Sequence, residues 1–407
     1  SRTNWKRKSR RSWGRLDMKS EWRTVALGSV ADLTVGFVGT MASNYTETGI
    51  PFLRSTNIEP FDIKLDDIKY ISSNFNESLR KSELHPNDVV IVRTGTPGAC
   101  AVIPAGVKAW NCSDLVIVRP HRNKLNPLFL ASYVNLASGV INTQLVGAVQ
   151  QHYNVGAAKK MQIPLPPIGE QDKIASIIGM LNKKITINSK INDNLFAQMQ
   201  ALYAAWFIDC IPFGGIKPSS WQKTSIYTIA DIIYGAPFSS KQFNTDGKGI
   251  PIIRIRDLKE QKVATYTTEK HPKGYLLQAG DIVVGMDGEF VPYIWGSDEA
   301  WLNQRVCVFK NKRLKGKAFL YFTIKPLLYA IEQTQVATTV IHIGKKDFDA
   351  FEITLPDPRV LDSFDAITTP MVEKIVENRF EIKQLELLRD ALLPKLMSGE
   401  LDVSNIQ

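Results

Sequence analysis

The sequence predicts an α+β protein in which two tandem mixed α/β lobes are separated by two long helices packed as an antiparallel coiled coil. Three observations predict this fold class. Short β-branched runs, punctuated by Gly, Pro, Asn and Asp, are typical of strands. Two long stretches carry apolar residues at steps of three and four, which is typical of helices. Finally, the order lobe then helix occurs twice along the 407-residue chain.

An internal duplication underlies this order. Matching residues occur in the same order in both halves, and the distance between matched residues falls from about 200 to 190 positions along the chain. The matches are Trp22 with Trp221, Ala31-Asp32 with Ala230-Asp231, Gly49–Arg54 with Gly249–Arg254, His152 with His342, and Leu165-Pro166 with Leu355-Pro356. A period this long exceeds that of solenoid repeats, so we expect two copies of a complete lobe-plus-helix unit.

The chain divides accordingly into five segments. Residues 1–17 hold seven basic residues and one acidic residue without apolar periodicity, so we expect a disordered basic extension or a tag, with a DNA-binding arm as the alternative. Residues 18–165 and 211–355 form the two lobes, in which runs such as Val89–Val92 and Ile282–Val284 predict short strands. A helix is expected in each lobe, near 127–138 and near 317–332.

Residues 166–210 and 356–407 are the two predicted long helices. Their apolar stripes comprise Ile174, Ile178, Leu181, Ile185, Leu195, Met199, Leu202 and Trp206 in the first, and Met371, Ile375, Ile382, Leu385, Leu388 and Leu392 in the second. The first stripe is too long for one lobe to cover, so we expect the helices to pair. Asn188, Asn192 and Asn378 fall near the seam and would fix its register. Pro370 predicts a break in the second helix after Thr369.

Composition narrows the class of protein. The net charge is +10, the lobes are basic and the helices are neutral to acidic, which favours lobes that bind nucleic acid and helices that bind protein. We find no signal peptide and no apolar run of membrane-spanning length, and expect a cytoplasmic protein. The cysteines Cys100, Cys112, Cys210 and Cys307 are too widely spaced for a zinc site or a disulfide framework, so we expect buried free thiols.

Catalytic motifs of phosphate-loop enzymes, hydrolases and zinc proteases do not occur in the sequence. Asp281, Asp287 and Glu289 could form the metal cluster of a nuclease, but carboxylates at strand ends and turns are the favoured interpretation. We therefore expect a chain that is not an enzyme, with no catalytic residue, no metal site and no cofactor of its own.

Polar loop residues are the candidate DNA contacts. Arg pairs with guanine and Asn or Gln with adenine through double hydrogen bonds, although such residues are also common on ordinary surfaces. In the first lobe the candidates are Arg54, Thr56, Asn57, Arg93, Thr94, Thr96, Gln150, Gln151, His152 and Asn154. In the second lobe they are Arg254, Arg256, Asn303, Gln304, Arg305, Thr338, Thr339, His342 and Lys345.

Several segments together resemble the specificity subunit of Type I restriction-modification systems. They are Ile163–Gln171 and Ile353–Pro356 after the lobes, Ala201–Asp209 at the end of the first long helix, and Leu387–Leu401 near the C-terminus. The resemblance covers about residues 18–407. The second helix departs from it, since it begins with Pro356-Asp357-Pro358 instead of the fuller Pro-Pro-x-x-Glu-Gln pattern seen after the first lobe.

The resemblance implies a non-catalytic subunit with two target recognition domains, each of which reads one half of a bipartite double-stranded DNA sequence. It implies helices that set the spacing of the half-sites and dock two modification (methyltransferase) subunits. Restriction (motor-nuclease) subunits would join the larger assembly. S-adenosylmethionine would then belong to the partner methyltransferase, and ATP and Mg²⁺ to the partner restriction subunit.

Other interpretations remain open at this point. The chain could be a stand-alone DNA-modifying enzyme, a nuclease or a methyltransferase, with duplicated DNA-binding lobes. It could be a structural coiled-coil adaptor. It could also serve a system that only methylates, because that difference lies in the partners.

Overall fold

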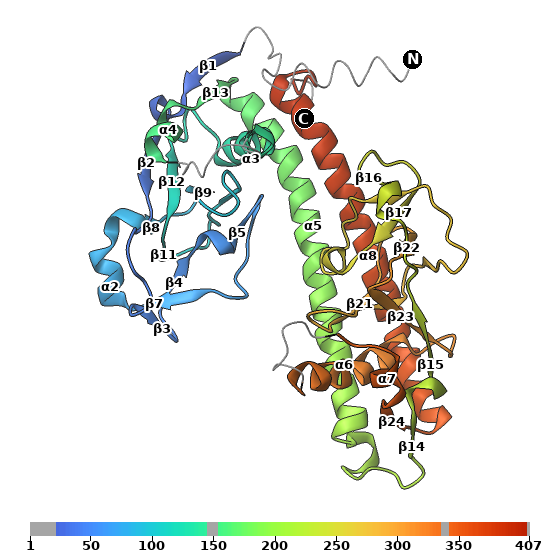
Figure 1. The fold of residues 1–407 in the computed structure, drawn as a ribbon. Helices are drawn as coiled ribbons and strands as arrows, with labels where there is room; N and C mark the ends of the chain where they lie inside the picture. The colour runs from blue at the N-terminus through green and yellow to red at the C-terminus, as the bar shows by residue number, and fades with distance from the viewer. Residues whose placement is uncertain (1–21, 145–153, 335–341, 405–407) are drawn as a thin grey trace. The chain divides into compact units, whose positions relative to one another are not determined.

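The computed structural model describes residues 22–144, 154–334 and 342–404 (Figure 1). The chain forms two compact units, one from residues 1–183 with 385–407 and the other from 184–384. The chain passes between them within the helices α5 (Ile168–Tyr203) and α8 (Pro358–Ser398). Each unit therefore contains one lobe and parts of both long helices.

Lobe 1 contains two larger sheets, ordered β10-β9-β12-β2 and β3-β7-β4-β11-β8, and two two-stranded sheets, β1-β13 and β5-β6. Its strands are β1 (Arg23–Ala26), β2 (Ala31–Val35), β3 (Tyr45–Thr46), β4 (Ile50–Leu53), β5 (Ile58–Glu59), β6 (Asp62–Ile63), β7 (Lys69–Ile71), β8 (Glu83–Leu84), β9 (Val89–Val92), β10 (Cys100–Val102), β11 (Trp110–Cys112), β12 (Leu115–Pro120) and β13 (Gln162–Leu165). Its helices are α2 (Ser73–Ser78), α3 (Pro127–Gln144) and α4 (Val155–Lys160).

Lobe 2 repeats this arrangement with sheets ordered β15-β23-β20-β21, β16-β18-β17-β22-β19 and β14-β24. Its strands are β14 (Gln222–Ser225), β15 (Ala230–Tyr234), β16 (Phe243–Asn244), β17 (Ile250–Ile253), β18 (Tyr266–Thr267), β19 (Leu276–Leu277), β20 (Ile282–Gly285), β21 (Pro292–Ile294), β22 (Ala300–Leu302), β23 (Val306–Asn311) and β24 (Glu352–Leu355). Its helices are α6 (Lys317–Thr334) and α7 (Lys345–Asp349). The predicted duplication and the expected helix in each lobe are confirmed, since strand order and helix positions correspond between the lobes.

Short turns of 3₁₀ helix connect these elements. They are η1 (Leu27–Ser29), η2 (Ser55–Asn57), η3 (Arg80–Ser82), η5 (Ile211–Phe213), η6 (Ile226–Thr228), η7 (Ser240–Gln242) and η8 (Ile255–Asp257). The π-helical turn η4 (Ala204–Ile208) continues directly from α5.

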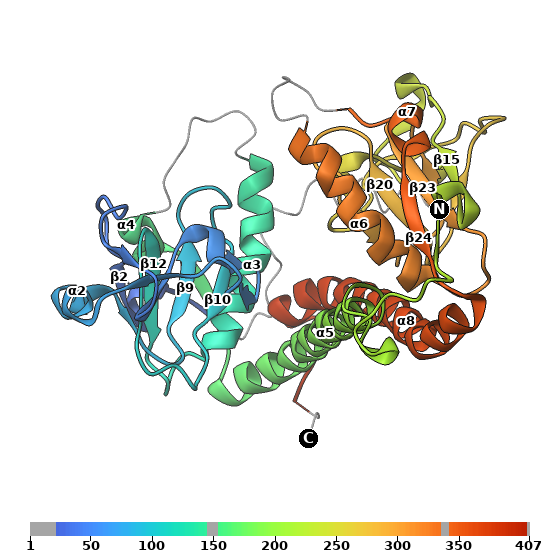
Figure 2. The same ribbon diagram turned by 90° about the horizontal axis from the view of Figure 1, so that it is seen from below.

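In each lobe, buried apolar side chains pack on both faces of the four-stranded sheet. In lobe 1 every residue of β9 is buried, and alternate side chains of β12 face opposite sides. Val116 and Val118 pack with α3, which lies along the sheet in Figure 2, whereas Leu115 and Ile117 pack with the five-stranded sheet. Lobe 2 repeats the alternation along β23. Burial on both faces explains why these strands are continuous apolar runs.

The predicted antiparallel pairing of the long helices is present within each unit. In the unit 184–384, the Asn378 amide donates a hydrogen bond to the Asn192 side-chain oxygen (2.9 Å), and the Asn188 amide donates to Glu381 (2.7 Å). All three asparagines are buried, as expected for seam residues. In the other unit, Ile174 and Ile178 pack against Leu396.

Replacing Asn192 by leucine is expected to lower the free energy of unfolding by about 2 kcal/mol, because the buried Asn378 amide then lacks its acceptor. The double variant Asn192→Leu/Asn378→Leu should recover most of this loss, since both polar groups are then replaced by apolar ones. Urea unfolding of the three proteins measures the difference. A double variant as unstable as the single one would show that the pair is not the cause.

Two expectations about the second long helix are wrong. Helix α8 continues through Pro370 without the predicted break. Leu361 and Phe364 before the proline, and Val372 and Ile375 after it, are all buried in one core, and this packing offsets the roughly 3 kcal/mol that a helical proline costs. Leu388, predicted on the apolar stripe, is 47% exposed.

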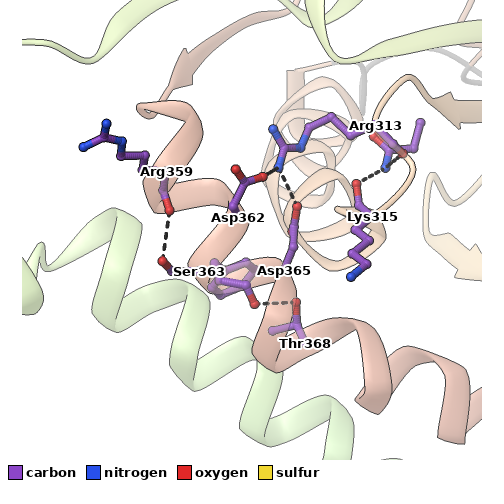
Figure 3. A network of polar contacts seen from close by, with 9 residues as sticks. Arg313, Lys315, Arg359, Asp362, Ser363, Asp365 and Thr368 are labelled. Carbon is purple, nitrogen blue, oxygen red and sulfur yellow. Dashed lines mark hydrogen bonds and ion pairs between the residues drawn. The ribbon is translucent and has the colours of Figure 1, made fainter.

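An ion-pair cluster built on one buried carboxylate, that of Asp365, attaches lobe 2 to α8 (Figure 3). The Arg313 guanidinium, from the loop between β23 and α6, donates to Asp362 (2.7 Å) and to Asp365 (2.9 Å) on the helix. The Asn311 amide donates to the carbonyls of Arg313 and Lys315 and so fixes the loop. Burial raises the pKa of the Asp365 carboxyl, and Arg313 opposes this rise.

Candidate nucleic-acid interface

Three loops of lobe 2, two of which carry predicted DNA contacts, meet beyond the end of β20. The backbone N–H of Met286 donates to the carbonyl of Arg305 (2.9 Å), and that of Ile343 donates to the carbonyl of Met286 (3.0 Å). Asp287 and His342 form an antiparallel β-bridge. The loop after β20, the loop between β22 and β23, and the segment before α7 are thus joined by main-chain hydrogen bonds.

The side chains of Asp287, Arg305 and His342 converge at this junction. The distance from His342 Nδ1 to Asp287 Oδ1 is 2.7 Å, and Arg305 Nη1 lies 3.5 Å from the same oxygen. Arg305 Nη1 is also 3.4 Å from His342 Nδ1. About half of the side chains of Arg305 and His342 is exposed, so both can meet a ligand from solvent. The structure therefore brings together two of the candidates predicted from sequence.

A related group lies at the corresponding place in lobe 1. Arg93 Nη1 donates to Asp114 Oδ1 (2.6 Å), and the Thr94 hydroxyl donates to Asp114 Oδ2 (3.1 Å). Asp114 adopts a positive φ of 51°, which turns the chain sharply between β11 and β12. Arg93 and Thr94 were predicted as DNA contacts. His152, the repeat partner of His342, lies outside the described residues.

A second pair of candidate loops follows β4 and β17. In lobe 1, Asn57 is buried; its side-chain oxygen accepts from the Arg54 N–H (3.0 Å), and its amide donates to the Lys64 carbonyl (3.0 Å). The prediction of Asn57 as a DNA contact is corrected, because its polar atoms hold the loop and are shielded from a ligand. Arg54 is 22% exposed and pairs with Asp67 (2.8 Å).

The matching loop of lobe 2 exposes more charge. Asp257 takes the place of Asn57 and accepts from the Arg254 N–H (3.0 Å). The Arg254 guanidinium donates to the Thr265 hydroxyl and lies 6.0 Å from the centre of the Phe243 ring. Arg256, by contrast, is 69% exposed. Of this group, Arg256 is the side chain best placed to reach a phosphate or a base.

The other candidates are dispersed. Thr56, Thr96 and Gln304 are exposed, and the Asn303 side-chain oxygen accepts from the Gln304 N–H (2.9 Å). Asn154 caps α4 by accepting from the Ala157 N–H (2.8 Å), and Lys345 pairs with Asp349 on α7 (2.7 Å). Gln150, Gln151, Thr338 and Thr339 lie outside the described residues. Contact of the remaining candidates with DNA stays a prediction.

Among residues 22–144, 154–334 and 342–404, no three His, Cys, Asp or Glu side chains are grouped as metal ligands would be. Asp281, considered above for a nuclease, is buried and accepts from Tyr275 (2.7 Å) and Lys310 (2.9 Å). Its repeat partner Asp88 accepts from Arg119 (3.4 Å) in the same way. The favoured interpretation of Asp281 as a structural carboxylate is therefore the one its geometry supports.

Sequence reasoning missed Asp114 and favoured Asp287 as a turn carboxylate, with a metal ligand as the alternative. Both hold a candidate DNA contact in place. Alignment of the two copies could have found Asp114, because Asp114 and the candidate Arg305 each directly precede corresponding strands, β12 and β23. Elsewhere, the four cysteines are buried free thiols, as expected. None of the described helices is both long enough and apolar enough to cross a membrane.

Residues 19–196 and 218–375 match the protein family described as the Type I restriction modification DNA specificity domain. The chain is 32% identical over 188 residues to the specificity subunit of Type I restriction enzyme EcoBI from Escherichia coli, which covers 45% of this chain and 40% of that subunit. It is 24% identical over 381 residues to the MjaVIII specificity subunit of Methanocaldococcus jannaschii, which covers 83% of this chain and 84% of the relative.

A solved structure shares the fold. The S subunit of a Type I restriction-modification system from M. genitalium matches with a TM-score of 0.55 at 15% identity, over 93% of this chain and 96% of that chain. The family match extends over more than half of the present sequence and falls on both repeats. This chain therefore belongs to the Type I restriction modification DNA specificity family.

Proposed function

We propose that this chain is the DNA sequence-specificity subunit of a Type I restriction-modification complex. Lobe 1 and lobe 2 each read one half of a bipartite double-stranded target. The observation that carries this proposal is the duplication: the three sheets of lobe 2 all have counterparts in lobe 1, and both lobes place candidate DNA contacts beyond the same strands. Two copies of one reader suit a target with two half-sites.

Helices α5 and α8 fix the spacing of the half-sites and dock two modification subunits, and restriction subunits complete the assembly. Exposed apolar side chains on these helices supply area for docking. They are Ile168, Met180, Ile187, Ile191, Ile367, Leu387 and Leu388. The chain itself is non-catalytic in this proposal. The methyltransferase binds S-adenosylmethionine, and the restriction subunit binds ATP and Mg²⁺.

Exchange of lobe 2, residues 211–355, for that of a relative is expected to change one half of the methylated motif and to leave the other half intact. The physical reason is that each lobe carries its own cores and its own candidate loops. The chimera would be expressed with the modification subunit of its system in cells that lack other methyltransferases, and the genome sequenced for methylated bases. Change in both halves, or in neither, would contradict the two-reader proposal.

The purified full-length chain separates this proposal from its rivals. Incubated alone with DNA, Mg²⁺ and S-adenosylmethionine, it should neither cleave nor methylate, whereas a stand-alone enzyme would turn over. Its DNA affinity should fall linearly on a log–log plot against salt concentration, because phosphate contacts release counterions. A coiled-coil adaptor would show no such DNA binding.

A further inference from the structure

The end of the central strand pair holds an ion pair in both lobes. In lobe 1, Val92 of β9 pairs with Leu115 of β12; in lobe 2, Gly285 of β20 pairs with Val306 of β23. Arg93 and Thr94 directly follow the first strand of lobe 1, as Met286 and Asp287 follow that of lobe 2. Asp114 and Arg305 directly precede the second strands. Asp114 and Arg305 thus occupy equivalent places in the fold, and their partners lie on the equivalent loop one position apart, Arg93 as the first residue after β9 and Asp287 as the second residue after β20.

The polarity of this pair is reversed between the lobes. In lobe 1 the cation is Arg93 on the first loop and the carboxylate is Asp114 on the second. In lobe 2 the carboxylate is Asp287 on the first loop and the cation is Arg305 on the second. Asp114 is 38% exposed against 17% for Arg93, whereas Arg305 is 56% exposed against 28% for Asp287. The more exposed member is therefore an acceptor in lobe 1 and a donor in lobe 2.

A neighbouring pair shows what a structural ion pair looks like in these lobes. Asp88 with Arg119 in lobe 1 corresponds to Asp281 with Lys310 in lobe 2. Both carboxylates are only 6% exposed, and the carboxylate and the cation occupy the same positions in both copies. The reversed pair is partly exposed and lies in loops, so fold stability constrains the sign of each member less than it does in the buried pair.

The sequence around Asp114 is strongly basic. Residues 89–165 contain seven basic residues and one acidic residue, Asp114. The net positive charge of this segment lowers the electrostatic cost of bringing a carboxylate near DNA phosphates. In lobe 2, His342 Nδ1 lies 2.7 Å from Asp287 Oδ1 and 3.4 Å from Arg305 Nη1, so an imidazole nitrogen joins the group around Arg305. Each lobe thus presents a small polar group whose side chains are held by hydrogen bonds or ion pairs from neighbouring loops.

We propose that these two groups are equivalent base-reading points with opposite hydrogen-bond polarity. Arg305, positioned by Asp287, donates to an acceptor edge such as guanine O6 and N7, while Asp114, positioned by Arg93 and Thr94, accepts from an amino group such as cytosine N4. This proposal rests on the proposed function and sharpens it. It assigns Asp287, Arg93 and Thr94 as positioning residues and names the base chemistry that each half-site presents.

The test uses the full chain with the modification subunit of its system, in cells that lack other methyltransferases, with sequencing of methylated bases. Arg305→Lys is expected to lose about tenfold in discrimination at one position of the second half-site, because lysine cannot donate the paired bonds. Asp114→Asn should alter one position of the first half-site. Glu352→Gln, which breaks an exposed pair with Lys223 in lobe 2, is the matched control and should leave both half-sites unchanged.

The charge-swapped variant Asp287→Arg/Arg305→Asp separates reading from a merely structural role. It restores an ion pair, and the preferred base at that position should shift from one with an acceptor edge to one with an amino group. If the charge-swapped variant directs methylation of the original motif, the proposal is overturned. The proposal would also be overturned if Arg305→Lys and Asp114→Asn kept the melting temperature of the unmodified chain and still methylated the original motif. If the unmodified chain itself directs no bipartite motif, the proposed function fails and this proposal fails with it.

Discussion

Replacing Arg313 by alanine is expected to destabilise lobe 2 by about 3 kcal/mol, the lower end of the range for breaking a buried ion pair. Figure 3 shows the reason: Arg313 bonds to both Asp362 and Asp365, and the side chain of Asp365 is 1% exposed. Without Arg313 a buried carboxylate loses its counter-charge. Urea unfolding measures the loss, and hydrogen exchange should localise it to the loop between β23 and α6 and to the start of α8.

The loss of stability in Arg313→Ala should become smaller as the pH falls. Removal of Arg313 raises the pKa of Asp365 further, so the folded variant binds the proton more tightly than the unfolded chain does. The deficit is therefore largest near neutral pH and shrinks as the pH falls toward the ordinary carboxyl pKa. Urea unfolding of Arg313→Ala and of the unmodified chain at about pH 7.5 and about pH 5 tests this. Lys223→Ala, from an exposed pair with Glu352, should cost less than about 1 kcal/mol at either pH. A deficit that does not change with pH would exclude Asp365 as its cause.

Insertion of seven residues after Lys183 in α5, together with seven after Gln384 in α8, is expected to lengthen the spacer of the methylated motif by about three base pairs. Both helices pass between the two units at these points, so the insertion leaves the contacts within each unit intact. Seven helical residues add about 10 Å, and DNA rises about 3.4 Å per base pair. A heptad also keeps the apolar face of the helix nearly in phase.

Overall affinity should fall in this variant, since three base pairs also turn one half-site by roughly 100° about the DNA axis. The half-site sequences themselves should be unchanged, because no lobe residue is altered. Insertion into α5 alone is the control: an unchanged α8 can then no longer match both the Asn188–Glu381 and Asn192–Asn378 pairs of one unit and the Ile174–Leu396 packing of the other, so methylation should be abolished. Retention of the natural spacer in the double insertion would rule out the helices as the ruler.

The general architecture could be predicted because it depends on patterns that lie within the sequence. The offset between Trp22 and Trp221, or between Gly49 and Gly249, shows the duplication directly. Apolar residues at helical spacing predicted the paired α5 and α8, and Asn192 and Asn378 fell on the seam as expected. The family resemblance was likewise visible in segments that flank the lobes, and the family match confirms it.

Local rules failed where tertiary packing outweighed them. Pro370 predicted a helix break, but Phe364 and Val372 on either side are held in one core, so α8 continues. Asn57 looked like a base-reading amide, yet it is buried and closes its own loop. In both cases the deciding contacts come from residues that no local sequence window can weigh against the local preference.

The sequence by itself determined the duplicated lobes, the two long helices and the family, because periodicity and repetition need no knowledge of which segments meet. Only the tertiary structure decided which polar residues act together. Asp287, Arg305 and His342 are separated by up to 55 residues and meet because main-chain hydrogen bonds join three loops. Asp114 faces Arg93 for the same reason, since the ladder of β9 and β12 places their loops side by side. Strand register, which depends on the whole sheet, therefore decides the charge that each lobe presents.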